Sequence, residues 1–166
     1  MTTPGTPSAS APDPVSPAGS ARVWRIEVRP AAGEADPRDA ATLEAARSAL
    51  GNTVTAVRTA EVFLVEAVID EVQARRIADE LLADPVNQTA ALGVAASDTP
   101  GTSVEVHYLP GVMDPVAEST QDAIREMLPE LDRDSGGVRV RTGTRYHLTH
   151  DTPLDRESVR RLARTR

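Results

Sequence analysis

Apolar and polar residues alternate along this chain with two different periods, and the switches between them predict its elements. The segments "VWRIEVR" (23–29) and "SVEVHYL" (103–109) alternate with a period of two, which is typical of half-buried strands. Elsewhere apolar residues recur every three or four positions, the spacing of an amphipathic helix. These helical stripes are Leu43, Ala46 and Leu50; Ala74, Ile77, Ala78 and Leu81; Val116, Thr120, Ala123, Ile124 and Met127; and Val159, Leu162 and Ala163.

The pattern occurs twice. At an offset of 78 positions residues 26–28 match residues 104–106, and the Asp-Pro step at 36–37 matches that at 114–115. The offset becomes 83 further on and 85 near the end, and each change falls between predicted elements. We infer a duplicated unit of about 70 to 80 residues, a size at which a small domain can fold alone. Later matches are Val57 with Val140, Arg58 with Arg141, Phe63 with Tyr146, Val65 with Leu148, and Asp70 with Asp155.

Four aspartates precede the helical segments and are predicted to cap them. An aspartate at this position accepts hydrogen bonds from backbone N–H groups that have no partner inside the helix. Proline suits the next position because it lacks an N–H. The predicted caps are Asp36, Asp70, Asp114 and Asp155.

The order of elements predicts an α+β fold of two tandem ferredoxin-like (βαββαβ) units. We expect hairpins at 54–67 and 138–148 and a last strand at 86–92 in the first unit only, so the second unit lacks its last strand and leaves a sheet edge to be covered. The predicted organisation is a disordered tail rich in Pro, Ser and Ala (1–21), unit one (22–94), a linker (95–102) and a truncated unit two (103–166).

The composition of the chain argues against several classes of partner and of catalysis. The net charge of −7 and pI near 5.0 argue against nucleic acid as a partner. Every basic residue is arginine, so lysine Schiff-base chemistry and a P-loop lysine are excluded, and the lack of cysteine excludes thiolate catalysis and disulfides. No apolar run reaches the roughly 18 residues of a membrane span. We therefore expect a cytoplasmic protein without a membrane partner.

No residue pattern predicts a catalytic, cofactor or metal site. His147 and His150 are three apart on a predicted strand end, where their rings need not converge, and no further ligands are arranged nearby. Arg58 and Arg141 occupy matching positions between Val and Thr, which indicates either an interface or turn contact or an anion contact. Arg75, Arg76, Arg160 and Arg161 are expected on solvated helix faces.

Several segments resemble one known family. "LEAARSAL", "VRTAEVFLVE" and "ARRIADELLADPV" in the first unit, and "VEVHYLPGVMDPVAESTQDAIREML" and "VRTGTRYHL" in the second, resemble PurS, the small subunit of phosphoribosylformylglycinamidine synthase, and the PurS-like amino-terminal region of single-chain forms of that enzyme. The resemblance covers residues 23–163. It departs from the family where Asp39 and Ala117 replace a glycine after Asp-Pro and where Asp84 replaces an asparagine.

The resemblance implies a role in de novo purine biosynthesis. PurS-like modules pair and contact the synthetase and glutaminase parts of the enzyme, supporting assembly and ammonia transfer without catalysis of their own. The chain would then be either a stand-alone tandem subunit that could form a homo-oligomer, or the amino-terminal portion of a longer glutamine-dependent ligase. The alternative function is a small-ligand regulatory module of duplicated ferredoxin-like type, with Arg58 and Arg141 as anion contacts.

Overall fold

The computed structural model describes residues 20–95, 99–131 and 137–164. These ranges contain five strands and four helices, and none of the helices is long and apolar enough to cross a membrane. A 3-10 turn, η1 (Gly51–Thr53), follows α1, and a π-helical segment, η2 (Ile77–Leu82), continues α2. The elements are β1 (Arg22–Pro30), α1 (Pro37–Leu50), β2 (Val54–Ala67), α2 (Glu71–Arg76), β3 (Gln88–Leu92), β4 (Gly101–His107), α3 (Pro115–Met127), β5 (Arg139–His150) and α5 (Arg156–Arg164).

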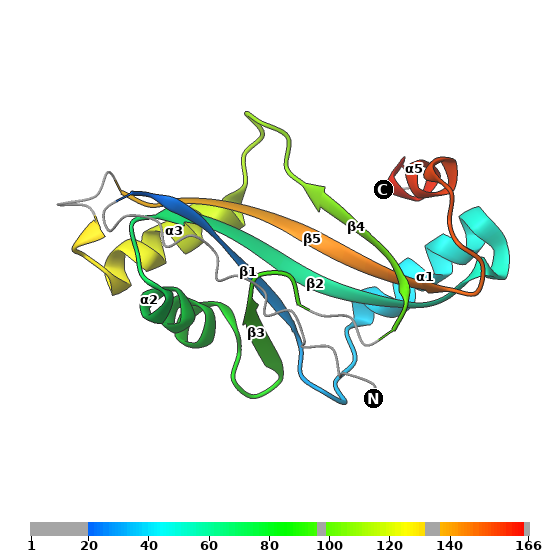
Figure 1. Ribbon diagram of the computed structural model, residues 1–166, viewed down its shortest axis with the longest axis horizontal. Coiled ribbons are helices and arrows are strands. Elements are labelled where there is room, and N and C mark those ends of the chain that lie inside the picture. The colour runs from blue at the N-terminus through cyan, green and yellow to red at the C-terminus, as the bar shows by residue number, and fades with distance from the viewer. Residues whose placement is uncertain (1–19, 96–98, 132–136, 165–166) are drawn as a thin grey trace, which may run out of the picture.

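All five strands join one open antiparallel sheet in the order β3-β1-β2-β5-β4, so the fold is α+β as predicted (Figure 1). The last strand of the first half is present as β3, two residues shorter at its start than expected. Within the predicted linker at 95–102, residues 96–98 lie outside the described ranges, and β4 begins at Gly101. The predicted tail at 1–21 lies outside them as well, apart from its last two residues.

The predicted hairpins are wrong, because each of the two segments forms one continuous strand, β2 and β5. A two-residue hairpin turn needs residues with positive φ. No described residue other than glycine has one, and Gly143, inside β5, is not among the glycines that do. Gly143 serves a different purpose: a Cβ there would overlap the imidazole of His107. The first half is therefore βαβαβ, and the halves do not form separate sheets.

The two halves join where β2 pairs with β5 over most of their lengths. Val57 pairs with Leu148, and Val65 pairs with Val140. In the sequence repeat Val57 matches Val140 and Val65 matches Leu148, so interchanging the halves turns one pair into the other. An approximate twofold axis through the middle of the two strands produces this reciprocity.

The outer strands follow the same relation. Ile26 of β1 pairs with Phe63, and the matching residue of the second half, Val104 of β4, pairs with Tyr146. Beyond β1 the sheet continues with β3. Beyond β4 no further strand is found in the described ranges, so β4 is an edge strand. The position that β3 fills in the first half is open in the second.

One face of the sheet packs on the helices in two hydrophobic clusters. α2, η2 and α3 cover the end of the sheet around Phe63, whereas α1 and α5 cover the other end around Tyr146 (Figure 1). Each end thus combines the first helix of one half with the second helix of the other. The larger cluster includes Trp24, Ile26, Val28, Phe63, Val65, Ile77, Ile124, Leu128 and Leu131, and the smaller includes Ala46, Val54, Val57, Tyr146 and Leu148.

Each of the four predicted cap aspartates accepts a hydrogen bond from a backbone N–H of its helix. The donors are the N–H groups of Arg38 for Asp36, Gln73 for Asp70, Ala117 for Asp114 and Ser158 for Asp155. Hydrogen bonds from the side chain and backbone of Arg38, which outweigh partial burial, hold the pKa of Asp36 below its usual range.

Two of the acidic helix starts also fix the central strands. Asp39 accepts from the backbone N–H of Thr59 at 2.8 Å, and Asp114 accepts from the backbone N–H of Thr142 at 3.0 Å. Thr59 and Thr142 are matching residues of the repeat. These bonds satisfy backbone donors of β2 and β5 at positions where neither β1 nor β4 pairs with them. The helix starts therefore hold β2 and β5 where the outer strands end.

Candidate functional site

The sheet face opposite the helices carries a cluster of charged and polar side chains from three strands. Strand alternation places residues 25 and 27 of β1, residues 103, 105 and 107 of β4, and residues 145 and 147 of β5 on this face. The segment that follows β3 contacts it through the backbone of Ala95 and Thr99. We call this set the polar cluster; its members are Arg25, Glu27, Ser103, Glu105, His107, Arg145 and His147.

Glu27 is the buried centre of the polar cluster, with 1% of its side chain exposed. Its carboxylate accepts hydrogen bonds from Arg25 at 2.5 and 3.1 Å and from Arg145 at 2.9 and 3.1 Å. It also accepts one from the backbone N–H of Ala95 at 3.0 Å. A buried carboxylate is costly unless its charge and its lone pairs are matched. Here two guanidinium groups and one amide meet both requirements.

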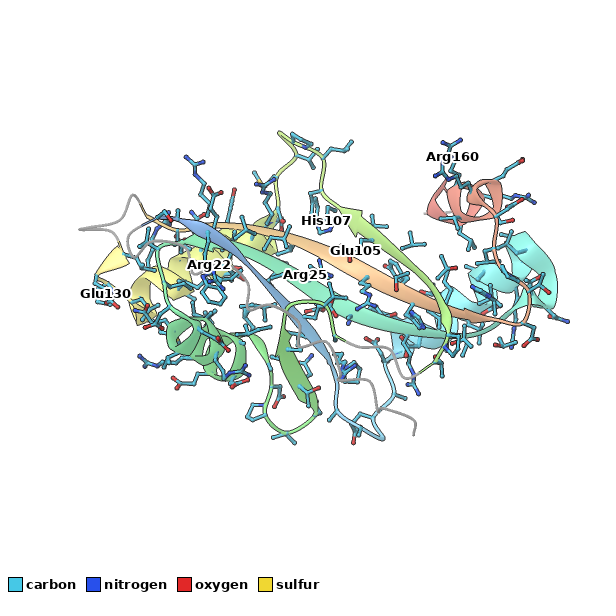
Figure 2. The ribbon with its side chains drawn as sticks, in the orientation of Figure 1. Arg22, Arg25, Glu105, His107, Glu130 and Arg160 are labelled. Atoms are coloured by element: carbon cyan, nitrogen blue, oxygen red, sulfur yellow. The ribbon has the colours of Figure 1, made fainter. Side chains whose placement is uncertain are left out.

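Glu105, which matches Glu27 in the repeat, lies on the other side of Arg25. Arg25 donates to it at 2.7 and 3.1 Å, and Nε2 of His107 lies 3.1 Å from its Oε2 (Figure 2). Partial burial acts to raise the pKa of Glu105, but the hydrogen bonds from Arg25 and His107 outweigh it and the pKa lies below its usual range. For Arg25 partial burial is likewise outweighed, by the two glutamates, and its pKa is raised. One arginine thus links the matching glutamates of both halves.

This arrangement suits cross-strand bracing better than proton transfer. Arg145 also donates to Ser103 and to the carbonyl of Ala95, and His147 contacts Ser103 and the carbonyl of Thr99. A general base needs a free lone pair directed at a substrate. Glu27 is instead fully engaged by protein donors, and both oxygens of Glu105 accept hydrogen bonds from Arg25. The two glutamates therefore connect β1, β4 and β5.

A cavity of about 400 Å³ lies beside the polar cluster. Its lining includes Arg29, Arg58, Asp39 and Thr59 together with cluster residues. Arg58 is 73% exposed and reaches Asp39 only at 3.8 Å, and Oγ1 of Thr59 is buried without a hydrogen-bond partner. An exposed guanidinium at the rim of a cavity is an arrangement that can accept an anionic group.

The structure separates the two arginines that the sequence singles out. Arg58 pairs with His147 in the ladder and lines the cavity, whereas Arg141 pairs with Leu64, is exposed, and does not line that cavity. Six ladder positions at roughly 3.4 Å each place them about 20 Å apart. One small anion cannot span that separation, so an anion contact of Arg58 would be separate from one of Arg141.

The two histidines near the end of β5 do not converge either. His147 contacts Ser103 and Thr99 on the polar face, while Nε2 of His150 lies 2.9 Å from Oγ1 of Thr102. Alternation along the strand directs them to opposite sides. Within residues 20–95, 99–131 and 137–164, no group of three or more His, Asp and Glu side chains is placed to hold a metal ion.

Sequence reasoning missed the polar cluster although a signal for it exists. In "RIEVR" and "VEVH" the polar residues occupy alternate positions, and Glu27 matches Glu105 in the repeat. Such charges are ordinarily assigned to a solvated strand face. Only the pairing of β5 with both β2 and β4 shows that Arg145 reaches Glu27 across a strand.

Comparisons with protein-family models, curated proteins and solved structures returned no significant match.

We expect Glu27→Gln to destabilise the fold by about 3–5 kcal/mol, because it removes the buried charge that balances Arg25 and Arg145. Urea denaturation measures the change. Glu44→Gln, at an exposed helix position, should stay within about 0.5 kcal/mol of the parent. Adding Arg145→Gln to Glu27→Gln should restore part of the loss, and simple additivity of the two losses would contradict the pairing.

The contribution of Glu105 should depend on pH. Its folded pKa is lowered, so its stabilising effect is complete above the unfolded value near 4 and is lost as pH falls through the folded pKa. The stability difference between the parent and Glu105→Gln should therefore be largest near neutral pH and shrink below about pH 4. Denaturation curves at several pH values test this; a difference that does not change with pH would disprove it.

Proposed function

We propose that the chain consists of two PurS-like units that join into one sheet. In this proposal each unit is ferredoxin-like, but its two central strands form one continuous strand instead of a hairpin. β2 and β5 then each extend into the other half and complete its part of the sheet. The reciprocal register of β2 and β5, which interchanges matched residues, is the observation that carries it. The combination of helices from both halves at each end of the sheet supports it further.

From this proposed likeness we infer that the chain is a non-catalytic component of phosphoribosylformylglycinamidine synthase and acts in the cytoplasm. The chain would contact the synthetase and glutaminase parts of the enzyme and support assembly and ammonia transfer, either as a separate subunit or as part of a longer synthase. The saturated carboxylate of Glu27 fits such a role, because the charged groups around it hold strands together.

Deleting the chain should abolish glutamine-dependent formation of the amidine product but leave ammonia-dependent formation intact. The physical reason is that the synthetase can take ammonia from solution, whereas ammonia made by the glutaminase must be handed over within an assembled complex. Both rates are measured in lysates of the deletion strain, and adding back the purified chain is the control. Unchanged rates with both nitrogen sources would refute the proposed role.

A second candidate function, binding of a small anionic metabolite, is favoured by the cavity at Arg58. It needs one arginine rather than two, since Arg141 lies elsewhere. A ligand that binds only the folded state stabilises it in proportion to the logarithm of its concentration.

Thermal-shift measurements with purine nucleotides and with amino acids test this candidate. A ligand at 100 times its dissociation constant should add about 2.7 kcal/mol to the stability of the parent. Arg58→Gln should lose that stabilisation and Arg141→Gln, the matched residue of the other half, should keep it. An equal response from both variants would exclude the cavity as the binding site.

A further inference from the structure

Exposed apolar side chains gather where β4 leads into α3. The backbone there makes a tight turn, in which the N–H of Val112 donates to the carbonyl of Leu109 at 3.0 Å and Gly111 has a φ of 84°. The turn holds its side chains outward, and Figure 1 shows this loop projecting past β4 on the side away from β5. The exposed fractions are Val106 40%, Tyr108 51%, Leu109 73%, Val112 54%, Met113 70% and Val116 50%.

The matching loop of the first half lacks large apolar side chains at these positions. Both loops keep the glycine with positive φ and the aspartate cap, so their backbones follow a similar course. Exposed apolar side chains are therefore not needed to build the loop, and a cluster of them marks a contact surface. The residues that match Leu109, Val112, Met113 and Val116 are Ala31, Glu34, Ala35 and Arg38.

The apolar loop adjoins the open edge of β4. The equivalent strand, β1, is covered by β3 in antiparallel pairing, and its Val28 is 1% exposed, compared with 40% for the matching Val106. An open edge presents unpaired backbone groups that can accept another antiparallel strand. We call β4 together with residues 108–113 and Val116 the edge surface.

We propose that the edge surface binds the same surface of a second copy of the chain, with the two β4 strands pairing antiparallel about a twofold axis at Val106. The two sheets then become one continuous sheet, with the apolar loops beside the new junction. This proposal is independent of the proposed function.

Polar complementarity selects both the second copy and the register. Glu105 and His107 are already paired within each chain. With the axis at Val106 the two pairs lie antiparallel, so each carboxylate is opposite an imidazole of the other copy and the two carboxylates stay apart. An axis at Glu105 would instead place two carboxylates face to face, which is destabilising. The same register pairs apolar residues on the other face of the sheet. Val106 lies opposite Val106 of the second copy, and Val104 lies opposite the second copy's Tyr108.

A single cysteine tests this register, because the chain contains no other. Residues directly opposite in an antiparallel pair have Cα atoms about 4.5–5.5 Å apart, within the range of a disulfide. Val106→Cys should form a disulfide-linked dimer on mild oxidation. Val72→Cys is the control, since Val72 is 77% exposed on α2, away from the edge surface, and it should remain monomeric on a non-reducing gel.

Sedimentation velocity at micromolar concentration measures the association itself. The parent and Val72→Lys should sediment as dimers, while Val106→Lys, which places like charges opposite each other, should raise the dimer dissociation constant about 100-fold or more. Replacing Leu109 and Met113 with alanine, as in the first half, should weaken the dimer without altering the circular dichroism spectrum.

Three results would overturn the proposal. A parent chain that sediments as a monomer excludes the second copy, and protection of its β4 amides from hydrogen exchange would then assign the edge to a segment of the same chain. A folded Val106→Lys that still dimerises would place the interface elsewhere. Equal cross-linking of Val106→Cys and Val72→Cys would exclude the register.

Discussion

The antiparallel pairing of β2 with β5 is the constraint on which the rest of the structure depends. These two long strands come from different halves of the repeat, and their ladder is the only connection that makes one sheet from the described parts of both. It also brings the first helix of each half next to the second helix of the other, which closes the two hydrophobic clusters. A half without its partner would leave one face of a long strand and two helix stripes uncovered.

The same pairing creates the polar cluster. Arg145 reaches Glu27 only because β5 lies one strand away from β1, and Arg25 reaches Glu105 only because β4 follows β5 in the sheet. Glu27 has 1% of its side chain exposed, and one of its two guanidinium partners, Arg145, comes from the other half. Without that half, a carboxylate buried to this extent would be strongly unfavourable. The buried charge therefore makes the two halves interdependent, in addition to their shared hydrophobic contacts.

The halves differ at their outer edges more than at their junction. The first half covers β1 with β3 and carries a loop of small and polar residues, whereas the second leaves β4 open in the described chain and carries an apolar loop of similar backbone. The junction is restrained because every change there affects both halves. An edge strand is restrained only by what binds to it, so a change there can create a new contact without affecting the junction.

The sequence alone determined the α+β class, the repeat, the positions of the helices and their capping aspartates, because period and capping are local properties of the chain. It did not determine that residues 54–67 and 138–148 are single strands, since alternation is the same in one long strand and in a hairpin, and only the partner strand decides between them. For the same reason the polar cluster and the separation of Arg58 from Arg141 follow from the register of β2 and β5. Register depends on residues more than 70 positions apart in the chain, and only the tertiary structure brings them together.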